Sequence, residues 1–219
     1  MSEPSWQLLL PEAPDGRITY LLCEPGEGER VFALLTPPRP ALCAVSFPDW
    51  FADLSPWPAP KVFAKGDDFA GHGEASLAAL LDLLPEVEKP LAGLPVRRML
   101  CGYSLAGLFA RWAATRTDAF PYLGSFSGSL WYPGAEDLGA RLAAARPMAV
   151  SLSLGDREKN ARQRQMATVE ERTLAVRDAL TAAGIPTAWT LHPGGHFNDP
   201  DGRTARGIDD GWRLTGTAR

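Results

Sequence analysis

Three kinds of chemically active side chain follow one another along this chain, each soon after a short apolar segment. They are Ser104, then Asp156 and Glu158, then His196. A serine hydroxyl is a weak nucleophile at neutral pH until a base takes its proton, and an imidazole suits that task. A carboxylate can hold the imidazole in the required tautomer and stabilise the imidazolium. The residue types and their order therefore predict nucleophilic catalysis through a serine.

Ser104 stands at a predicted corner between a buried strand at 96–101 and a helix at 105–115. The first segment is short and mostly apolar, and the second repeats apolar residues at helical spacing. A serine at such a corner is held in a strained backbone conformation, which requires small residues two positions before and two positions after it. Gly102 and Ala106 meet this requirement, although the usual pattern has glycine at the second position.

The same corner could bind negative charge. A helix that begins at Leu105 points its N-terminus at Ser104, so the Leu105 N–H could stabilise an oxyanion without a special side chain. The alternative is that Ser104 only caps an ordinary core helix, because a Gly-x-Ser sequence is common before helices. The positions of the acid and the histidine favour the catalytic interpretation.

His196 is the candidate base among three histidines. It follows the predicted strand 186–192, and the glycines before it would let its loop reach the serine. His192 belongs to the end of that strand, and His72 precedes a predicted helix. A metal site at His192 and His196 is not expected, because Pro193-Gly194-Gly195 prevents the helix that would align them and no third ligand is near in sequence. We therefore predict neither a metal nor a cofactor.

Two acids compete for the third position. Glu158 stands three residues after Gly155, a spacing that carries an acid over the edge of a sheet, whereas Asp156 follows the glycine directly. The spacing favours Glu158 and keeps Asp156 as the alternative. A solvated charged turn would also explain both acids, because Arg157 and Lys159 lie beside them.

The segments that must position these residues alternate between strands and helices from residue 41 onward. This alternation predicts an α/β fold with a mostly parallel sheet and helices on both faces. Before it, the runs 17–24 and 30–36 flank Pro25-Gly26-Glu27-Gly28 and predict an antiparallel hairpin. The expected strands are 41–47, 61–65, 96–101, 122–127, 148–154 and 186–192, and the expected helices are 73–90, 105–115, 135–145, 168–183 and 202–214.

A segment rich in proline and tryptophan, 47–60, is too irregular for a regular element and is predicted to be a loop. It leaves the carboxyl end of the predicted strand 41–47, where the functional loops of such sheets gather. Four aromatic residues could line a pocket or cap the core, and they are Trp50, Trp57, Trp131 and Tyr132.

Composition narrows the class of partner. A chain of 219 residues with 45% hydrophobic residues can bury a sizeable core, and we expect a single domain over 1–219. The net charge of −4 and the scattered basic residues provide no basic field for nucleic acid or anionic lipid, so we expect a small-molecule partner. The oligomeric state stays open.

Neither a signal peptide nor a membrane span is expected. Residues 1–14 lack a basic segment and a small-residue cleavage site, and no apolar run approaches about 18 residues. Cys23, Cys43 and Cys101 lie in apolar segments without metal-ligand spacing, and an odd number does not suit a disulfide framework. These features predict buried thiols in a reducing cytoplasm.

Five motifs occur in an order and spacing that resemble a known group. They are residues 71–75, 102–109, 126–132, 154–158 and 193–197. Together they resemble the esterase D-like branch of the α/β-hydrolases, and within it the predicted hydrolases related to bacterial siderophore (enterobactin-type) esterases. The resemblance covers the chain from about residue 40 to 205.

The resemblance implies an α/β-hydrolase fold and a serine hydrolase of carboxylic esters; no large cap domain is expected, because the chain has no evident cap insertion. It also implies roles for individual residues: Ser104 as nucleophile, His196 as base, Glu158 or Asp156 as acid, and the Leu105 N–H in the oxyanion hole.

The chain departs from this group in its first half. Members tend to carry an Asp-Gly pair after the strand that precedes the oxyanion loop, whereas Phe47-Pro48-Asp49-Trp50 stands here. Proline has no N–H, so the second oxyanion donor is expected at Asp49 or Trp50. The chain also lacks a cap insertion and the clustered basic residues that would suit an anionic catecholate siderophore, so the substrate does not follow from the resemblance.

The leading hypothesis is a cytoplasmic esterase that needs no cofactor and hydrolyses a small-molecule ester through an acyl-enzyme. An acyltransferase with the same three residues is one alternative. A binding module that kept the fold and lost turnover is the other, because Ala106 and the rebuilt loop at 47–50 depart from the usual pattern.

Overall fold

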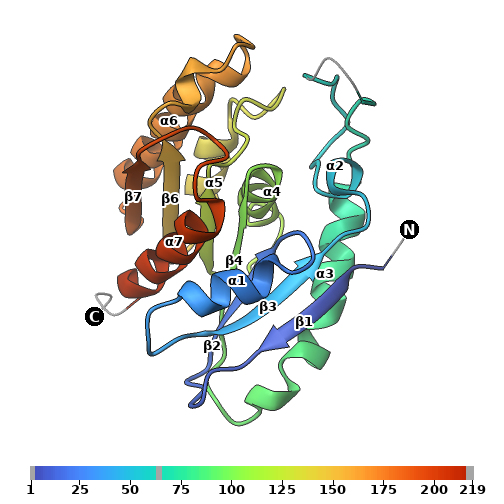
Figure 1. Cartoon of the computed structure of the whole chain (residues 1–219), viewed down its shortest axis with the longest axis vertical. Helices are drawn as coiled ribbons and strands as arrows, with labels where there is room; N and C mark the ends of the chain where they lie inside the picture. Colours follow the sequence, from blue (N-terminus) through green and yellow to red (C-terminus); the bar gives the residue numbers. More distant parts are fainter. Residues whose placement is uncertain (1–2, 63–65, 216–219) are drawn as a thin grey trace.

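A computed structural model describes residues 3–62 and 66–215 of the chain (Figure 1). Among these residues, seven strands form one sheet in the order β1-β3-β2-β4-β5-β6-β7. All neighbouring strands are parallel except β1 and β3, which are antiparallel. The strands are β1 (Ser5–Leu9), β2 (Arg17–Leu22), β3 (Ala41–Ser46), β4 (Arg97–Tyr103), β5 (Tyr122–Phe126), β6 (Ala149–Gly155) and β7 (Thr187–His192).

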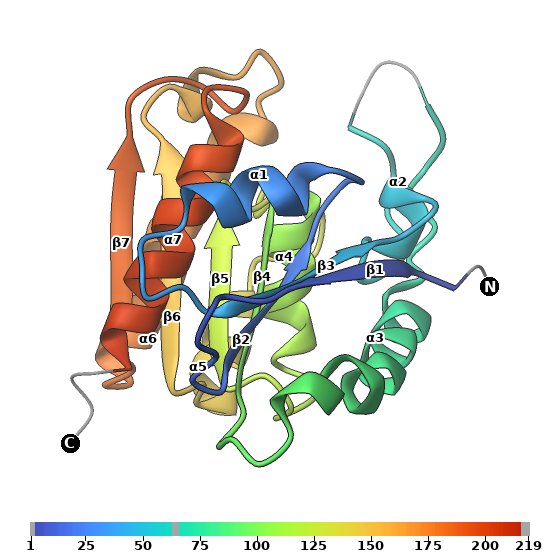
Figure 2. The ribbon, with the colours of Figure 1, turned by 60° about the horizontal axis from the view of Figure 1, so that its bottom comes forward.

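Helices cover both faces of the sheet (Figures 1 and 2). The α-helices are α1 (Glu27–Leu34), α2 (Trp50–Asp53), α3 (Gly73–Val87), α4 (Leu105–Ala113), α5 (Leu138–Ala145), α6 (Val169–Ala182) and α7 (Pro200–Leu214). Helices α1 and α7 pack on one face, and α4, α5 and α6 lie on the other. The predicted α/β architecture with a mostly parallel sheet is therefore confirmed.

Alternation along the strands builds a separate apolar core on each face. In β3, Leu42 and Ala44 pack with residues of α1 and α7, whereas Cys43 and Val45 point to the larger core with α3 and α4. Successive side chains of a strand point to opposite faces, so both halves of a buried strand must be apolar. This requirement explains why the central strands read as continuous apolar runs in the sequence.

The predicted hairpin of 17–24 and 30–36 is wrong in its second half. Residues 17–22 form β2 as expected, but 27–34 form the helix α1. Periodicity cannot separate a short buried helix from a strand, so packing selects the helix here. The helix α1 passes directly over β3, and a Cβ at Gly28 would overlap the Ala44 side chain. The antiparallel pairing near the N-terminus instead joins β1 to β3.

Two further differences concern the region after β3. The predicted loop 47–60 contains the short helix α2, whose N-cap Asp49 accepts hydrogen bonds from two backbone N–H groups. The predicted strand 61–65 lies partly outside the described residues, and Lys61 and Val62 belong to no strand. The other predicted elements are found within a few residues of their expected bounds. Across the described parts of the chain, every helix is too short or too polar to span a membrane.

Candidate functional site

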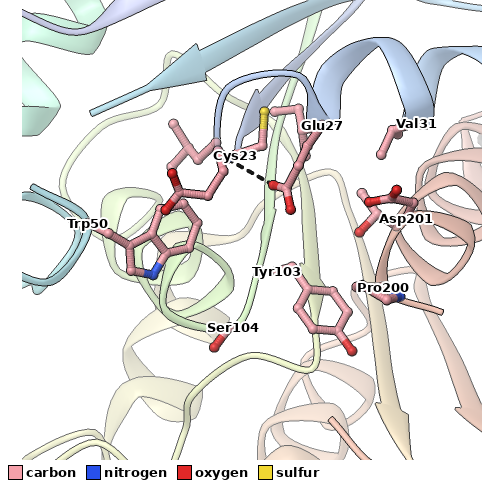
Figure 3. Close-up of a pocket in the computed structure, with 12 residues that line it drawn as sticks. Cys23, Glu27, Val31, Trp50, Tyr103, Ser104, Pro200 and Asp201 are labelled. Atoms are coloured by element: carbon pink, nitrogen blue, oxygen red, sulfur yellow. Dashed lines mark hydrogen bonds between the residues drawn. The ribbon is translucent and has the colours of Figure 1, made fainter. Parts of the chain in front are cut away.

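Ser104 lies at the corner between β4 and α4, at the carboxyl edge of the sheet. Its backbone has φ 57° and ψ −122°, a conformation that costs energy for any residue with a side chain. Its side chain faces a cavity that Trp50 and Tyr103 also line (Figure 3). The predicted strand-to-helix corner is confirmed.

Close packing of Gly102 against Ala106 allows this corner. A Cβ at Gly102 would lie 2.5 Å from the Ala106 Cβ, a separation that packed side chains do not adopt. The Ala106 methyl group is fully buried and occupies the space that a side chain at Gly102 would need. Alanine is therefore accommodated at this position because glycine stands at the other.

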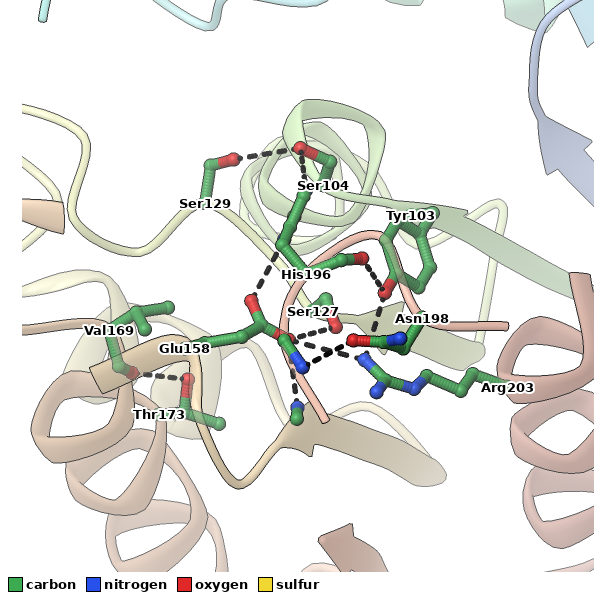
Figure 4. Close-up of polar contacts among 12 residues, drawn as sticks. Tyr103, Ser104, Ser127, Ser129, Glu158, Val169, Thr173, His196, Asn198 and Arg203 are labelled. Carbon is green, nitrogen blue, oxygen red and sulfur yellow. Dashed lines mark hydrogen bonds and ion pairs between the residues drawn. The ribbon is translucent and has the colours of Figure 1, made fainter. Parts of the chain in front are cut away.

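Ser104, His196 and Glu158 form a continuous chain of polar contacts (Figure 4). The Ser104 Oγ lies 3.0 Å from His196 Nε2, and His196 Nδ1 lies 2.8 Å from Glu158 Oε2. With the imidazole protonated at Nδ1, that nitrogen donates to the carboxylate and Nε2 accepts from the serine hydroxyl. The fold thus brings together three residues that are 92 and 38 positions apart along the chain.

Glu158 is held in place by three groups besides the histidine. It stands in the 3₁₀ turn Glu158–Asn160, which follows β6. Its Oε1 accepts hydrogen bonds from Ser127 Oγ at 2.6 Å and from the Gly155 N–H at 2.8 Å, and Arg203 Nη1 lies 3.5 Å away. Burial raises the pKa of Glu158, but the contacts with His196, Ser127 and Gly155 outweigh burial and lower that pKa. The carboxyl group is therefore ionised at neutral pH.

Asp156 has a different partner. Its carboxylate accepts a hydrogen bond from the Gly194 N–H at 2.8 Å, and its own N–H donates to the His192 carbonyl at 2.8 Å. The first contact ties the turn after β6 to the loop that carries His196, and the second ties it to the end of β7. Of the two predicted acids, Glu158 is the one that contacts the imidazole.

Two residues that the sequence analysis missed support the histidine loop. The Tyr103 hydroxyl donates to the His196 carbonyl at 2.6 Å, and Arg203 Nη1 donates to that hydroxyl at 3.2 Å. Arg203 Nη2 also donates to the Pro193 carbonyl at 2.9 Å. Arg203 is almost fully buried on α7. Tyr103 is adjacent to the serine, which is a sequence signal, whereas Arg203 is brought to the site by the fold.

Ser127 and Ser129 were also missed as site residues, although the sequence analysis noted their segment. Ser127 adopts φ 46° just after β5, which turns its hydroxyl toward Glu158. The Ser129 N–H donates to the Ser104 carbonyl at 3.0 Å, and the two Oγ atoms are 3.3 Å apart. The segment after β5 therefore contacts both Ser104 and Glu158, which are the two ends of the chain of polar contacts.

The predicted oxyanion donors differ in their surroundings. Leu105 begins α4 and lines the larger cavity at the site. The Asp49 N–H donates to the Asp53 carboxylate at 3.1 Å, so it is engaged. Trp50 begins α2 and lines both cavities that border Ser104. In the sheet β2, rather than β3, lies next to β4, so the loop after β2 also borders the site.

A larger and a smaller cavity, both formed by described residues, border Ser104. The larger has a volume of about 950 Å³, and its aromatic lining consists of Trp50, Phe51, Phe69, Tyr103, Trp131 and Phe197. The smaller has a volume of about 90 Å³ and lies between the ends of β2 and β4 and the first turns of α1 and α7.

The aromatic residues singled out in the sequence have two different roles. Trp50 and Trp131 line the larger cavity. Trp57 and Tyr132 are held behind it, because Tyr132 donates to the Trp57 carbonyl at 2.6 Å and the Trp57 indole donates to the Pro133 carbonyl at 2.7 Å.

His192 lies apart from this arrangement. It is buried at the end of β7, and burial together with Arg206 and Arg203 lowers its pKa. Within the described ranges, no three His, Cys, Asp or Glu side chains gather in a way that could hold a metal ion.

Solved structures with the same fold include several esterases. The siderophore hydrolase EstA from Aspergillus nidulans is 18% identical, with a TM-score of 0.71 over 93% of this chain and 84% of that one. An IroE-like serine hydrolase from Shewanella oneidensis is 19% identical, with a TM-score of 0.72 over 95% and 74%. An enterochelin esterase from Shigella flexneri is 19% identical, with a TM-score of 0.64 over 96% of this chain and 55% of that one.

The neighbours establish that the chain has the α/β-hydrolase fold, and they include siderophore esterases, the group that the motifs resemble. No family model and no curated protein matches the chain in sequence.

Proposed function

We propose that this protein is a serine esterase that hydrolyses a carboxylic ester of a small molecule, with Ser104 as nucleophile, His196 as base and Glu158 as acid. The proposal rests on the contacts of 3.0 Å and 2.8 Å that join these three residues at the edge of a cavity. The esterases among the structural neighbours support it.

In the first half of the reaction, Ser104 Oγ attacks the ester carbonyl while His196 Nε2 takes the hydroxyl proton. A bond forms between Oγ and the carbonyl carbon, and the carbonyl oxygen becomes an oxyanion. When the intermediate collapses, the bond to the alcohol breaks and His196 gives its proton to the departing oxygen. The acyl group is then bound to Ser104.

In the second half, water takes the place of the alcohol. His196 removes a proton from the water, whose oxygen bonds to the acyl carbon. The bond between that carbon and Ser104 Oγ then breaks, the carboxylic acid is released, and His196 returns the proton to Oγ. Glu158 keeps Nδ1 protonated throughout and stabilises the imidazolium that forms twice. Its lowered pKa suits this role because the carboxylate must stay ionised.

The oxyanion requires backbone donors. We assign the Leu105 N–H at the start of α4 as one donor, since it directly follows the nucleophile. For the second donor we prefer the Trp50 N–H to that of Asp49, because the Asp49 N–H already donates to Asp53. The N-terminus of α4 adds favourable positive potential.

The test is mass spectrometry of the intact protein after treatment with a fluorophosphonate probe, followed by peptide mapping. An activated Ser104 should give a single adduct on that residue, and Ser104→Ala should give none. A protein that stays unlabelled, or a Ser104→Ala variant that hydrolyses esters like the parent, would contradict the assignment.

We also infer that the protein works in a reducing compartment, the cytoplasm. Its three cysteines are buried and unpaired, which supports this location. The substrate remains a small molecule in this proposal, and the aromatic lining of the larger cavity suits an apolar portion of it.

A further inference from the structure

Glu27 lines both cavities that border Ser104. Figure 3 shows its side chain in the smaller one. It lies in the first turn of α1, and its side chain is 30% exposed. Its Oε2 accepts a hydrogen bond from the Glu24 N–H at 2.8 Å, whereas its Oε1 has Arg30 Nη2 at 3.9 Å. Arg30 is engaged elsewhere, because its Nε donates to Asp201 at 2.6 Å. The charge of Glu27 is therefore only partly balanced, because Arg30 is shared between two carboxylates and lies closer to Asp201.

The local fold does not require this charge. Glu27 accepts a hydrogen bond from the Glu24 N–H in the turn before its helix, and a neutral glutamine oxygen would accept that bond equally well. Burial and the nearby Asp201 raise the pKa of Glu27, so its environment disfavours the charged form in the absence of a further cation. An acid at this position is explained better by recognition than by folding.

The rest of the lining has the same sign of charge. Carboxylates on the smaller cavity are Glu24, Glu27 and Asp201, and those on the larger cavity include Asp49, Asp67 and Asp68. Among the described residues that line either cavity, none is a lysine or an arginine. Arg30 contacts Glu27 and Asp201 from outside the lining and balances only one of these negative charges. Charges of one sign around a cleft attract the opposite charge and repel the same charge. The site is thus suited to a cationic ligand.

The two cavities divide the ester between them. The departing alcohol must receive a proton from His196, and that imidazole lines the larger cavity but not the smaller one. The alcohol therefore belongs in the larger cavity, and the acyl part in the smaller one beside Glu27. Because a cavity of about 150 Å³ holds benzene, one of about 90 Å³ accepts only a short acyl chain.

We propose that the substrate is an ester whose short acyl part carries a protonated amine, which pairs with the Glu27 carboxylate. This inference rests on the esterase function proposed above. It also resolves an electrostatic conflict, since a carboxylate that shares the cavity with Ser104 would oppose the oxyanion unless a cation lies close to it.

The test compares three esters of 2-phenylethanol that differ only at the acyl end. The β-alanyl ester is cationic, the butanoyl ester is neutral and of the same length, and the monosuccinyl ester is anionic. We expect kcat/KM to be at least about tenfold higher for the β-alanyl ester than for the butanoyl ester, and lowest for the succinyl ester. Each value is divided by the rate constant for alkaline hydrolysis to remove differences in intrinsic reactivity.

Glu27→Gln should lower the ratio of kcat/KM for the β-alanyl ester to kcat/KM for the butanoyl ester about tenfold. The substitution removes the charge and keeps the hydrogen bond from the Glu24 N–H. Glu29→Gln is the matched control. Glu29 lies exposed on the same helix and lines neither cavity, so its loss should leave the ratio unchanged. A second readout needs no variant: β-alanine amide should inhibit the wild type at lower concentrations than butanamide.

Two kinds of failure can be told apart. If the butanoyl ester is cleaved in a Ser104-dependent way but the β-alanyl ester is not preferred, or Glu27→Gln keeps the wild-type ratio, the inference about the amine is wrong and the esterase function stands. If Ser104→Ala cleaves the esters as fast as the wild type, the esterase function fails, and the inference that depends on it falls too.

Discussion

The hydroxyl of Tyr103 donates a hydrogen bond of 2.6 Å to the backbone carbonyl of His196. Tyr103 immediately precedes Ser104, so one strand end carries the proposed nucleophile and also anchors the loop of the proposed base. Burial raises the pKa of Tyr103, and the hydroxyl therefore stays protonated as a donor at neutral pH. Tyr103 is thus joined both to Ser104, through the chain, and to the His196 loop, through its hydroxyl, and this helps to fix the distance between Ser104 Oγ and His196 Nε2.

Removing this anchor should slow the reaction. Tyr103→Phe keeps the ring and loses the donor, so we expect kcat/KM for a simple ester to fall about fivefold, the cost of one hydrogen bond. Tyr103 acts through His196, so the rate of fluorophosphonate labelling at Ser104 should fall in parallel. An unchanged labelling rate would show that the histidine loop is held without it.

The two acids should differ in their effect on activity. Glu158→Gln removes the charge that stabilises the imidazolium, and kcat should fall about a hundredfold or more. Asp156→Asn keeps an oxygen that can accept from the Gly194 N–H, so kcat should change by less than about threefold. Steady-state kinetics on one ester measures both. The reverse order of effects would transfer the role of acid to Asp156.

Glu158 should also make stability depend on pH. Its contacts with His196, Ser127 and Gly155 overcome burial and hold its pKa below the ordinary value of 4.5. A carboxyl group with a lowered pKa in the folded state stabilises the fold above pH 4.5, and this contribution disappears as the pH falls through the lowered pKa. Glu158→Gln should therefore lower the free energy of unfolding by about 2 kcal/mol at pH 7. The difference between wild type and variant should shrink at a pH below the lowered pKa of Glu158, and urea titrations at pH 7 and at that acidic pH measure it. If the difference is the same at both pH values, it does not come from the charge of Glu158.

The elbow packing predicts a coupled pair of substitutions. Gly102→Ala would place its methyl group 2.5 Å from the Ala106 methyl group and 2.8 Å from the Ala106 carbonyl carbon, and it should destabilise the protein by about 1–3 kcal/mol. Adding Ala106→Gly removes the second methyl group, so the double variant should be more stable than Gly102→Ala alone. Thermal unfolding of the three variants gives the coupling energy. If the effects of the two substitutions on stability simply add, the two residues do not limit each other's size.

A buried arginine should be dispensable for folding. Arg111 on α4 is fully buried, and among the described residues its guanidinium finds no hydrogen-bond partner. Burial lowers its pKa to about 9. Arg111→Met fills a similar volume without the desolvation cost and should raise the free energy of unfolding by about 1–3 kcal/mol.

Thermal unfolding of Arg111→Met should show a melting temperature several degrees above that of the wild type. Arg116→Met is the control, because Arg116 forms an exposed ion pair with Glu74 that contributes little. A lower melting temperature for Arg111→Met would reveal a stabilising role of the buried guanidinium.

Features that depend on neighbouring residues could be predicted from the order of amino acids. The buried strand before Ser104, the helix after it and the small residues at 102 and 106 are local requirements. The alternation of strands and helices limits the fold to a parallel sheet, and it places Ser104, the acidic pair and His196 at the same edge. These predictions hold because a few adjacent side chains decide each of them.

Contacts between distant segments decided the rest. Residues 30–34 are helical because Gly28 allows α1 to lie on Ala44 of β3, and no local pattern contains that information. The choice of Glu158 over Asp156 as the partner of His196 depends on how two loops meet. Arg203 reaches the site from the far end of the chain through the packing of α7. Burial and hydrogen bonding between remote residues are properties of the assembled structure, so the local sequence pattern leaves them open.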